Sequence, residues 1–166
     1  MTATVRPRKT LAPAATEGKP IRILAVDYGR KRIGLALSDE LGLTAQPLAV
    51  FKRGNRRNDS RRLREICRKH AVAYILVGHP LHMTGEAGEM ADEAARFAKR
   101  LNKELGIEVE LLDERLTSWE AQQTMAETKS SSRRHGSLDD VAAAILLRDY
   151  LERKCGQARD AVAERD

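Results

Sequence analysis

The fold is decided by residues 23–39, which read Ile-Leu-Ala-Val-Asp-Tyr-Gly-Arg-Lys-Arg-Ile-Gly-Leu-Ala-Leu-Ser-Asp. The apolar run at 23–26 is typical of a strand that is covered on both faces of a sheet. A tight turn at Gly29 precedes a second apolar run, so we expect antiparallel strands at 21–28 and 32–38. Asp27 lies where the first strand ends, and α/β proteins collect ligands at such strand ends. A carboxylate there suits a divalent cation, which prefers hard oxygen ligands.

The remaining sequence predicts three more strands and four helices around this pair. We expect strands at 45–52, 72–78 and 107–113, helices at 59–70, 86–105, 117–127 and 138–153, and polar loops at 55–59 and 129–136. Gly106 is the expected stop of the second helix region, and Ser137 is a plausible cap for the last one. The order of elements predicts an α/β fold with a mixed five-stranded sheet and helices on both faces. Strands four and five should run parallel to strand one.

The chain has 166 residues, the length of one compact domain with a real core. Residues 1–20 contain no continuous apolar stretch and are interpreted as a disordered basic tail rather than a targeting peptide. The predicted domain covers 21–154, and a polar C-terminal tail follows at 155–166. Cys67 and Cys155 have no metal-type spacing, which is typical of reduced cytoplasmic thiols. No apolar run approaches the roughly 18 residues of a membrane span.

The net charge is +6, and the basic residues are unevenly distributed. They form three clusters: Arg30, Lys31 and Arg32; Lys52, Arg53, Arg56, Arg57, Arg61, Arg62, Arg64, Arg68 and Lys69; and Arg133 and Arg134. On charge alone, binding to a polyanionic partner and simple exposure to solvent are equally good interpretations of these clusters. Aromatic residues make up only 4% of the chain, so backbone phosphate contact is a better prediction than extensive base stacking.

Acidic residues occur at three element ends. They are Asp27 after strand one, Asp113 and Glu114 after strand five, and Asp139 and Asp140 at the start of the last helix. The parallel strands place the first two groups at one sheet edge, and the last helix can bring the third there. Such a cluster would hold one or two Mg²⁺ or Mn²⁺ ions.

Each acidic group also has a structural reading. The aspartates of the last helix complement its dipole, and Asp113 or Glu114 could pair with Arg115 or cap the next helix. Strand four ends in Gly78 and His79 without a carboxylate, so Glu114 would have to reach across that strand to approach Asp27.

Two other kinds of site are disfavoured. His79 and His82 lie on one loop and His135 on another, and zinc needs more converging ligands than these. Gly85 and Gly88 are not followed by the Gly-Lys-Ser/Thr of a phosphate loop.

Four short motifs in order resemble the RuvX family, also called YqgF, over about residues 21–153. They are Asp27-Tyr28-Gly29 with Arg32 to Ala36 and Ser38-Asp39; Val77-Gly78-His79-Pro80 with Gly85; Asp113-Glu114-Arg115-Leu116-Thr117; and Asp139 with Ala142, Ala143 and Leu147. Members are RNase H-like and are described as Holliday junction resolvases and as nucleases that process precursor ribosomal RNA. The resemblance implies catalytic and metal-binding roles for Asp27, Glu114 and Asp139. Asp139 fits the family register better than Asp140.

The resulting hypothesis is a cytoplasmic, Mg²⁺- or Mn²⁺-dependent nuclease that processes pre-16S rRNA, with Holliday junction resolution as the alternative. The residues expected to bind nucleic acid are Arg30, Lys31, Arg32, Arg56, Arg57, Arg61, Arg133 and Arg134. A nucleic-acid binder without catalysis, acting in transcription or ribosome assembly, is a second class, but it gains nothing from acids beside phosphates. An actin-like ATPase or sugar kinase needs a second domain for which 166 residues leave no room. Monomer and homodimer both stay open.

Overall fold

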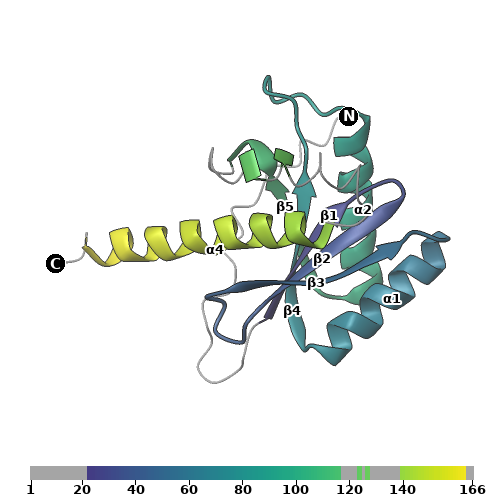
Figure 1. Cartoon of the computed structure of the whole chain (residues 1–166), viewed down its shortest axis with the longest axis horizontal. Coiled ribbons are helices and arrows are strands. Elements are labelled where there is room, and N and C mark those ends of the chain that lie inside the picture. The colour runs from purple at the N-terminus through teal and green to yellow at the C-terminus, as the bar shows by residue number, and fades with distance from the viewer. Residues whose placement is uncertain (1–21, 117–122, 125, 128–138, 164–166) are drawn as a thin grey trace, which may run out of the picture.

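A computed structural model describes residues 22–116, 123–124, 126–127 and 139–163 (Figure 1). The expected N-terminal tail, most of the expected helix at 117–127, the basic loop at 129–136 and Ser137 lie outside the described residues. Where the 117–127 segment is described, at 123–124 and 126–127, it is helical.

Five strands form one mixed sheet in the order β3-β2-β1-β4-β5. The strands are β1 Arg22–Tyr28, β2 Arg32–Ser38, β3 Ala45–Lys52, β4 Val72–His79 and β5 Glu108–Asp113. β1 pairs antiparallel with β2 and parallel with β4, and β4 pairs parallel with β5. The predicted strands and their directions are therefore confirmed. The ends of β1, β4 and β5 meet at one edge, which we call the carboxyl edge.

Helices cover both faces of the sheet, as predicted (Figure 1). Helices α1 Arg56–Lys69 and α2 Glu89–Leu105 pack on one face, which we call the helical-pair face. Helix α4 Asp139–Ala163 packs on the other, which we call the α4 face. Alternation along the strands divides the core between them: Leu24 and Val26 of β1 face the helical pair, whereas Ile23 and Ala25 face α4.

Three polar side chains, from β4, β5 and α4, meet on the α4 face of the sheet. The hydroxyl of Tyr74 in β4 donates a hydrogen bond to Glu110 of β5, and the hydroxyl of Tyr150 in α4 lies 3.5 Å from Oε2 of the same carboxylate. Burial raises the pKa of both tyrosines, so both stay protonated donors. The group therefore connects α4 to β4 and β5.

Three helix boundaries differ from those expected. Helix α1 starts at Arg56 rather than 59, because the Asn55 side chain accepts a hydrogen bond from Asn58 N at 2.9 Å and caps it. Helix α2 starts at Glu89 rather than 86, after Gly88. Helix α4 runs to Ala163, through Gly156 and residues that the sequence assigned to a polar tail. One exposed glycine costs a helix only about 1 kcal/mol, which a continuing helix tolerates.

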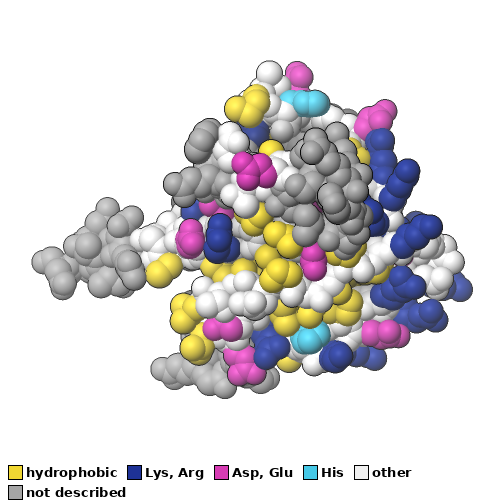
Figure 2. All heavy atoms as spheres, in the orientation of Figure 1, with side chains coloured by type: hydrophobic (Ala, Val, Ile, Leu, Met, Phe, Trp, Pro, Cys, Tyr) yellow, Lys and Arg dark blue, Asp and Glu magenta, His cyan; other side chains and the backbone are white. Residues whose placement is uncertain are grey.

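Basic side chains gather on one side of the surface. Figure 2 shows Lys and Arg along the side where α1 lies, and apolar side chains between α4 and the strands beneath it. Within the described parts of the chain, none of the helices has the length and apolarity needed to cross a membrane.

Candidate active site at the carboxyl edge

Asp27 is a buried acidic residue at the end of β1, with 9% of the residue exposed. The strand alternation that sends Ala25 to the α4 face sends Asp27 there too. Its partner across β2 is Gly34. On the other side Val26 pairs with Val77, so the residue that follows alongside Asp27 is Gly78. Asp27 therefore has a glycine beside it on each neighbouring strand, and no side chain crowds it within the sheet.

Gly78 makes room for Glu114. A Cβ atom added at Gly78 would lie 2.6 Å from Glu114 Oε1 and 3.3 Å from Leu146 Cδ1 of α4. The carboxylate of Glu114 therefore lies directly over the backbone of β4, on the same face as Asp27. The structure thus places Glu114 across strand four. The sequence motif contained Gly78, but only the packed sheet shows that its missing side chain is the space the carboxylate fills.

Asp113 forms an ion pair with Arg115. Its Oδ1 accepts hydrogen bonds from Arg115 N at 3.0 Å and Arg115 Nε at 3.1 Å, and its Oδ2 accepts one from Arg115 Nη2 at 2.7 Å. The Arg115 guanidinium holds the pKa of Asp113 below its ordinary range, so this carboxylate is ionised at neutral pH. The Asp113–Arg115 pair spans Glu114, which lies between the two residues and begins the short 3₁₀ helix η1 Glu114–Leu116. The sequence suggested that Asp113 either pairs with Arg115 or caps the next helix, and the structure shows the pair with Arg115.

The loop between β4 and α2 packs on the same arginine. Gly85 has φ of +90°, and a Cβ there would lie 3.2 Å from Arg115 Nη1. The guanidinium thus joins this loop to the end of β5.

Helix α4 begins at Asp139, one residue after the start expected from the sequence. Leu146, against Gly78, is seven residues further on, so the helix start lies about 10 Å along the axis from that contact. The side chain of Asp139 is outside the described residues, and Asp140 Oδ1 accepts a hydrogen bond from Val141 N at 2.9 Å. Among the side chains that the structure describes, no group of three or more His, Cys, Asp or Glu gathers. At the carboxyl edge, the α4 face therefore carries Asp27 on β1 and Glu114 over β4 as neighbouring carboxylates.

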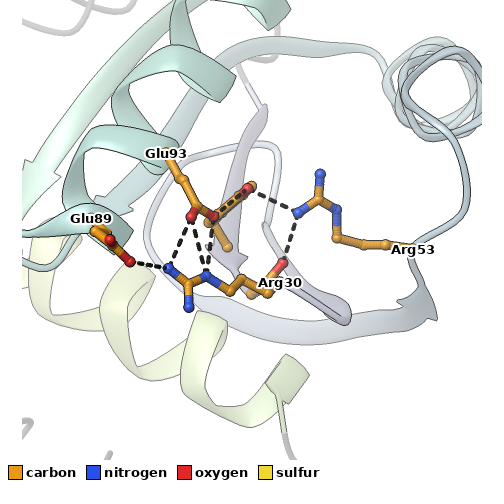
Figure 3. Close-up of polar contacts among 6 residues, drawn as sticks. Arg30, Arg53, Glu89 and Glu93 are labelled. Carbon is orange, nitrogen blue, oxygen red and sulfur yellow. Dashed lines mark hydrogen bonds and ion pairs between the residues drawn. The ribbon is translucent and has the colours of Figure 1, made fainter.

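The basic residues at the carboxyl edge are not equivalent. Arg30, in the β1–β2 turn, is paired: its Nη2 lies 3.0 Å from Glu93 Oε1 and 3.1 Å from Glu89 Oε2 (Figure 3). Two carboxylates thus neutralise a side chain that the sequence assigned to nucleic acid. Lys31 is exposed and Arg32 half-buried.

On α1, Arg56, Arg57 and Arg61 are exposed, whereas Arg133 and Arg134 lie outside the described residues. Arg53, just after β3, was not among the predicted site residues although it lies in the second basic cluster. Its Nη1 donates to Tyr28 Oη at 2.9 Å and to the Gly29 carbonyl at 3.1 Å (Figure 3). Arg53 is therefore held beside the residue that follows Asp27.

Comparison with known proteins agrees with this architecture. A family model described as "RuvX: Holliday junction resolvase" matches residues 21–153. A protein of Koribacter versatilis named "Putative pre-16S rRNA nuclease" is 40% identical over 143 residues, which cover 86% of this chain and 92% of that relative. One of Syntrophus aciditrophicus with the same name is 43% identical over 133 residues, or 80% and 89%.

Among solved structures, Thermus thermophilus RuvC in complex with Holliday junction substrate has a TM-score of 0.55 at 13% identity, covering 82% of this chain and 96% of that one. At this identity the likeness concerns the fold, and it confirms the RNase H-like prediction. The family match spans the whole sheet and includes Asp27, Gly78, Glu114 and Asp139. The chain therefore belongs to the RuvX family.

Proposed function

We propose that this protein is a metal-dependent nuclease that hydrolyses phosphodiester bonds in structured nucleic acid. The observation that carries the proposal is the placement of Glu114 over Gly78, beside the buried Asp27. Two carboxylates on one face of a sheet edge supply the hard oxygen ligands that a divalent cation prefers, and a cation bound there would offset the negative charge of both.

Asp27, Glu114 and, by the family register, Asp139 would hold Mg²⁺ or Mn²⁺. The bound metal would lower the pKa of a water nucleophile and stabilise the leaving oxygen. The donor set fits hard cations because it consists of carboxylate oxygens. The protein's own part is to orient these oxygens: β1 fixes Asp27, and the Asp113–Arg115 pair fixes the turn that carries Glu114.

Precursor 16S rRNA is the proposed substrate, because two relatives at 40% and 43% identity carry that name. Resolution of Holliday junctions is the second candidate, favoured by the description of the family model and by the fold shared with RuvC. The cytoplasm is the proposed site of action, since both the ribosomal precursor and the chromosome are there in bacteria. A monomer and a homodimer are both compatible with the single set of carboxylates.

The deciding experiment is a cleavage assay with Mg²⁺ or Mn²⁺ on a pre-16S rRNA fragment and on a four-way DNA junction. Asp27→Asn should abolish cleavage of the true substrate with the fold intact, because it removes one charge from the cation site. Asp92→Asn, at an exposed carboxylate of α2, is the matched control and should cleave normally. Equal cleavage by wild type and Asp27→Asn would assign the activity to another site. Binding without cleavage of either substrate would favour the non-catalytic binder.

The loop containing Arg133 and Arg134 immediately precedes Asp139 in sequence, so it can place a phosphate beside the carboxylates. Fork-shaped guanidinium donors suit phosphate oxygens. Replacing both arginines with Ala should weaken nucleic-acid binding and reduce the slope of log affinity against log salt by up to about two. An unchanged slope would place the main contact surface elsewhere.

A further inference from the structure

Two guanidinium groups lie over a pair of adjoining aromatic rings on the helical-pair face. The rings of Tyr28 and Phe97 have centroids 4.9 Å apart. The Arg53 guanidinium carbon lies 4.8 Å from the Tyr28 centroid, and that of Arg100 lies 5.5 Å from the Phe97 centroid. Arg56, the first residue of α1, is close enough to repel Arg100. We call Arg53, Arg56 and Arg100 the arginine triad.

The guanidinium groups of the arginine triad have more N–H donors than the surrounding protein has acceptor atoms for them. Arg53 uses Nη1 for Tyr28 and Gly29, and its Nε lies 3.4 Å from Asp59 Oδ2. Among the described residues, neither its Nη2 nor any nitrogen of Arg100 has a hydrogen-bond acceptor, and Arg100 Nε is buried. Of these unbonded nitrogens only Arg100 Nε is buried, so the remaining N–H groups reach the surface, where a phosphate oxygen can accept hydrogen bonds from them.

The triad is also poorly neutralised. Burial lowers the pKa of Arg100, and repulsion by Arg56 and Arg53 lowers it further, with only a partial opposing effect from Glu104. Asp59 balances Arg53 alone, and its other oxygen accepts the backbone N–H of Gly54 at 3.0 Å. Arg30, two residues after Tyr28 in the sequence, is the contrasting case, because it forms ion pairs with two glutamates, Glu89 and Glu93 (Figure 3).

The triad lies at the same sheet edge as the carboxylates but on the opposite face. Asp27 and Tyr28 are consecutive in β1, so their side chains point to opposite faces, and the half-buried Tyr28 packs against the core of the helical-pair face. Arg53 bonds to Tyr28, which fixes the triad at the end of β1. A nucleic-acid strand that crosses the edge can therefore contact both groups at once.

We propose that Arg53, Arg56 and Arg100 form a second phosphate-binding site, which takes a backbone phosphate of the substrate away from the cleaved bond. The site rests on the proposed nuclease function but is separate from the carboxylates. A phosphate there accepts hydrogen bonds from Arg53 Nη2 and Arg100 and relieves the repulsion within the triad. It also fixes how the nucleic acid crosses the edge, which sets the position of the scissile bond on the α4 face.

The test compares Arg100→Met with Lys99→Met. Methionine keeps an apolar stem over Phe97 and removes the donors. Lys99 is the neighbouring exposed cation on α2, and its loss changes net charge equally. Affinity for a labelled duplex RNA and a four-way DNA junction is measured without divalent metal over a range of KCl concentrations. We expect Arg100→Met to lose about 5- to 20-fold in affinity and about one unit of salt slope, and Lys99→Met to lose little.

Equal affinities and equal slopes for the two variants would overturn the proposal. Arg56→Gln, at an exposed helix start, gives the same comparison if Arg100→Met fails to fold. The binding assay contains no catalytic metal, so a wild type that never cleaves would refute the nuclease function while leaving this test intact. A wild type that cleaves, with triad variants that bind normally, would refute the triad alone.

Discussion

Gly78→Ala should disable catalysis by displacing Glu114 while leaving the fold in place. The added methyl group would lie 2.6 Å from Glu114 Oε1, whereas ordinary contacts start at 3.4 Å. The carboxylate must therefore retreat by about 0.8 Å, the difference between these two distances. Leu146 of α4, 3.3 Å from the methyl position, limits any relief on that side. A misplacement of about 1 Å at a catalytic group costs on the order of 100-fold in rate, or roughly 2.7 kcal/mol in the activation free energy.

The stability of Gly78→Ala should change much less than its activity. Overpacking costs about 1–3 kcal/mol, and replacing a strand glycine recovers roughly 0.5–1 kcal/mol. Single-turnover cleavage at saturating Mg²⁺ or Mn²⁺, together with urea unfolding, separates the two effects. Gly156→Ala is the control, because nothing lies within 4 Å of its new methyl group and the residue is helical. A folded Gly78→Ala protein that cleaves at the wild-type rate, at every metal concentration, would refute the role assigned to Glu114.

Three further substitutions test the supports of the site. Asp113→Asn removes the charge that pairs with Arg115, so cleavage should fall about tenfold. Because Arg115 lowers the pKa of Asp113, the loss of stability in this variant, measured by urea unfolding, should be full above pH 3.8 and should vanish as the pH falls below it. Tyr74→Phe removes a hydrogen bond to the Glu110 carboxylate and should lower stability by about 1.5–3 kcal/mol, seen as a lower Tm, whereas a Tm equal to wild type would deny that this bond stabilises the pairing of β4 with β5. Gly85→Ala forces φ of +90° on an alanine and should cost about 1–3 kcal/mol in urea unfolding, and no loss would mean that the loop rearranges freely.

The strands and their relative directions could be predicted from the sequence alone. The apolar runs and the turn at Gly29 predict β1 and β2, and the crossovers through α1 and α2 require β4 and β5 to run parallel to β1. Asp27 stands out because a carboxylate at the end of a buried strand has few structural uses. These features depend on local periodicity and on connections between neighbouring elements, which a sequence displays directly.

Helix ends were harder to predict because side-chain hydrogen bonds decide them. The Asn55 cap moves the start of α1 into residues that read as a polar loop. Residues 154–163 include three Ala with Lys, Gln and Arg, which favour continued helix, but Gly156 and the polar composition suggested a tail.

The meeting of charged groups could not be predicted without the packed structure. Glu114 reaches Gly78 because β4 and β5 pair in one register, and Arg30 is neutralised because α2 brings Glu93 to it across 63 residues of sequence. Arg100 was not a candidate, since its partners Arg53 and Arg56 come from another part of the chain. Such contacts depend on distances between remote segments after packing. The order of residues fixes which groups exist, and the packed sheet and helices determine which of them share an electrostatic environment.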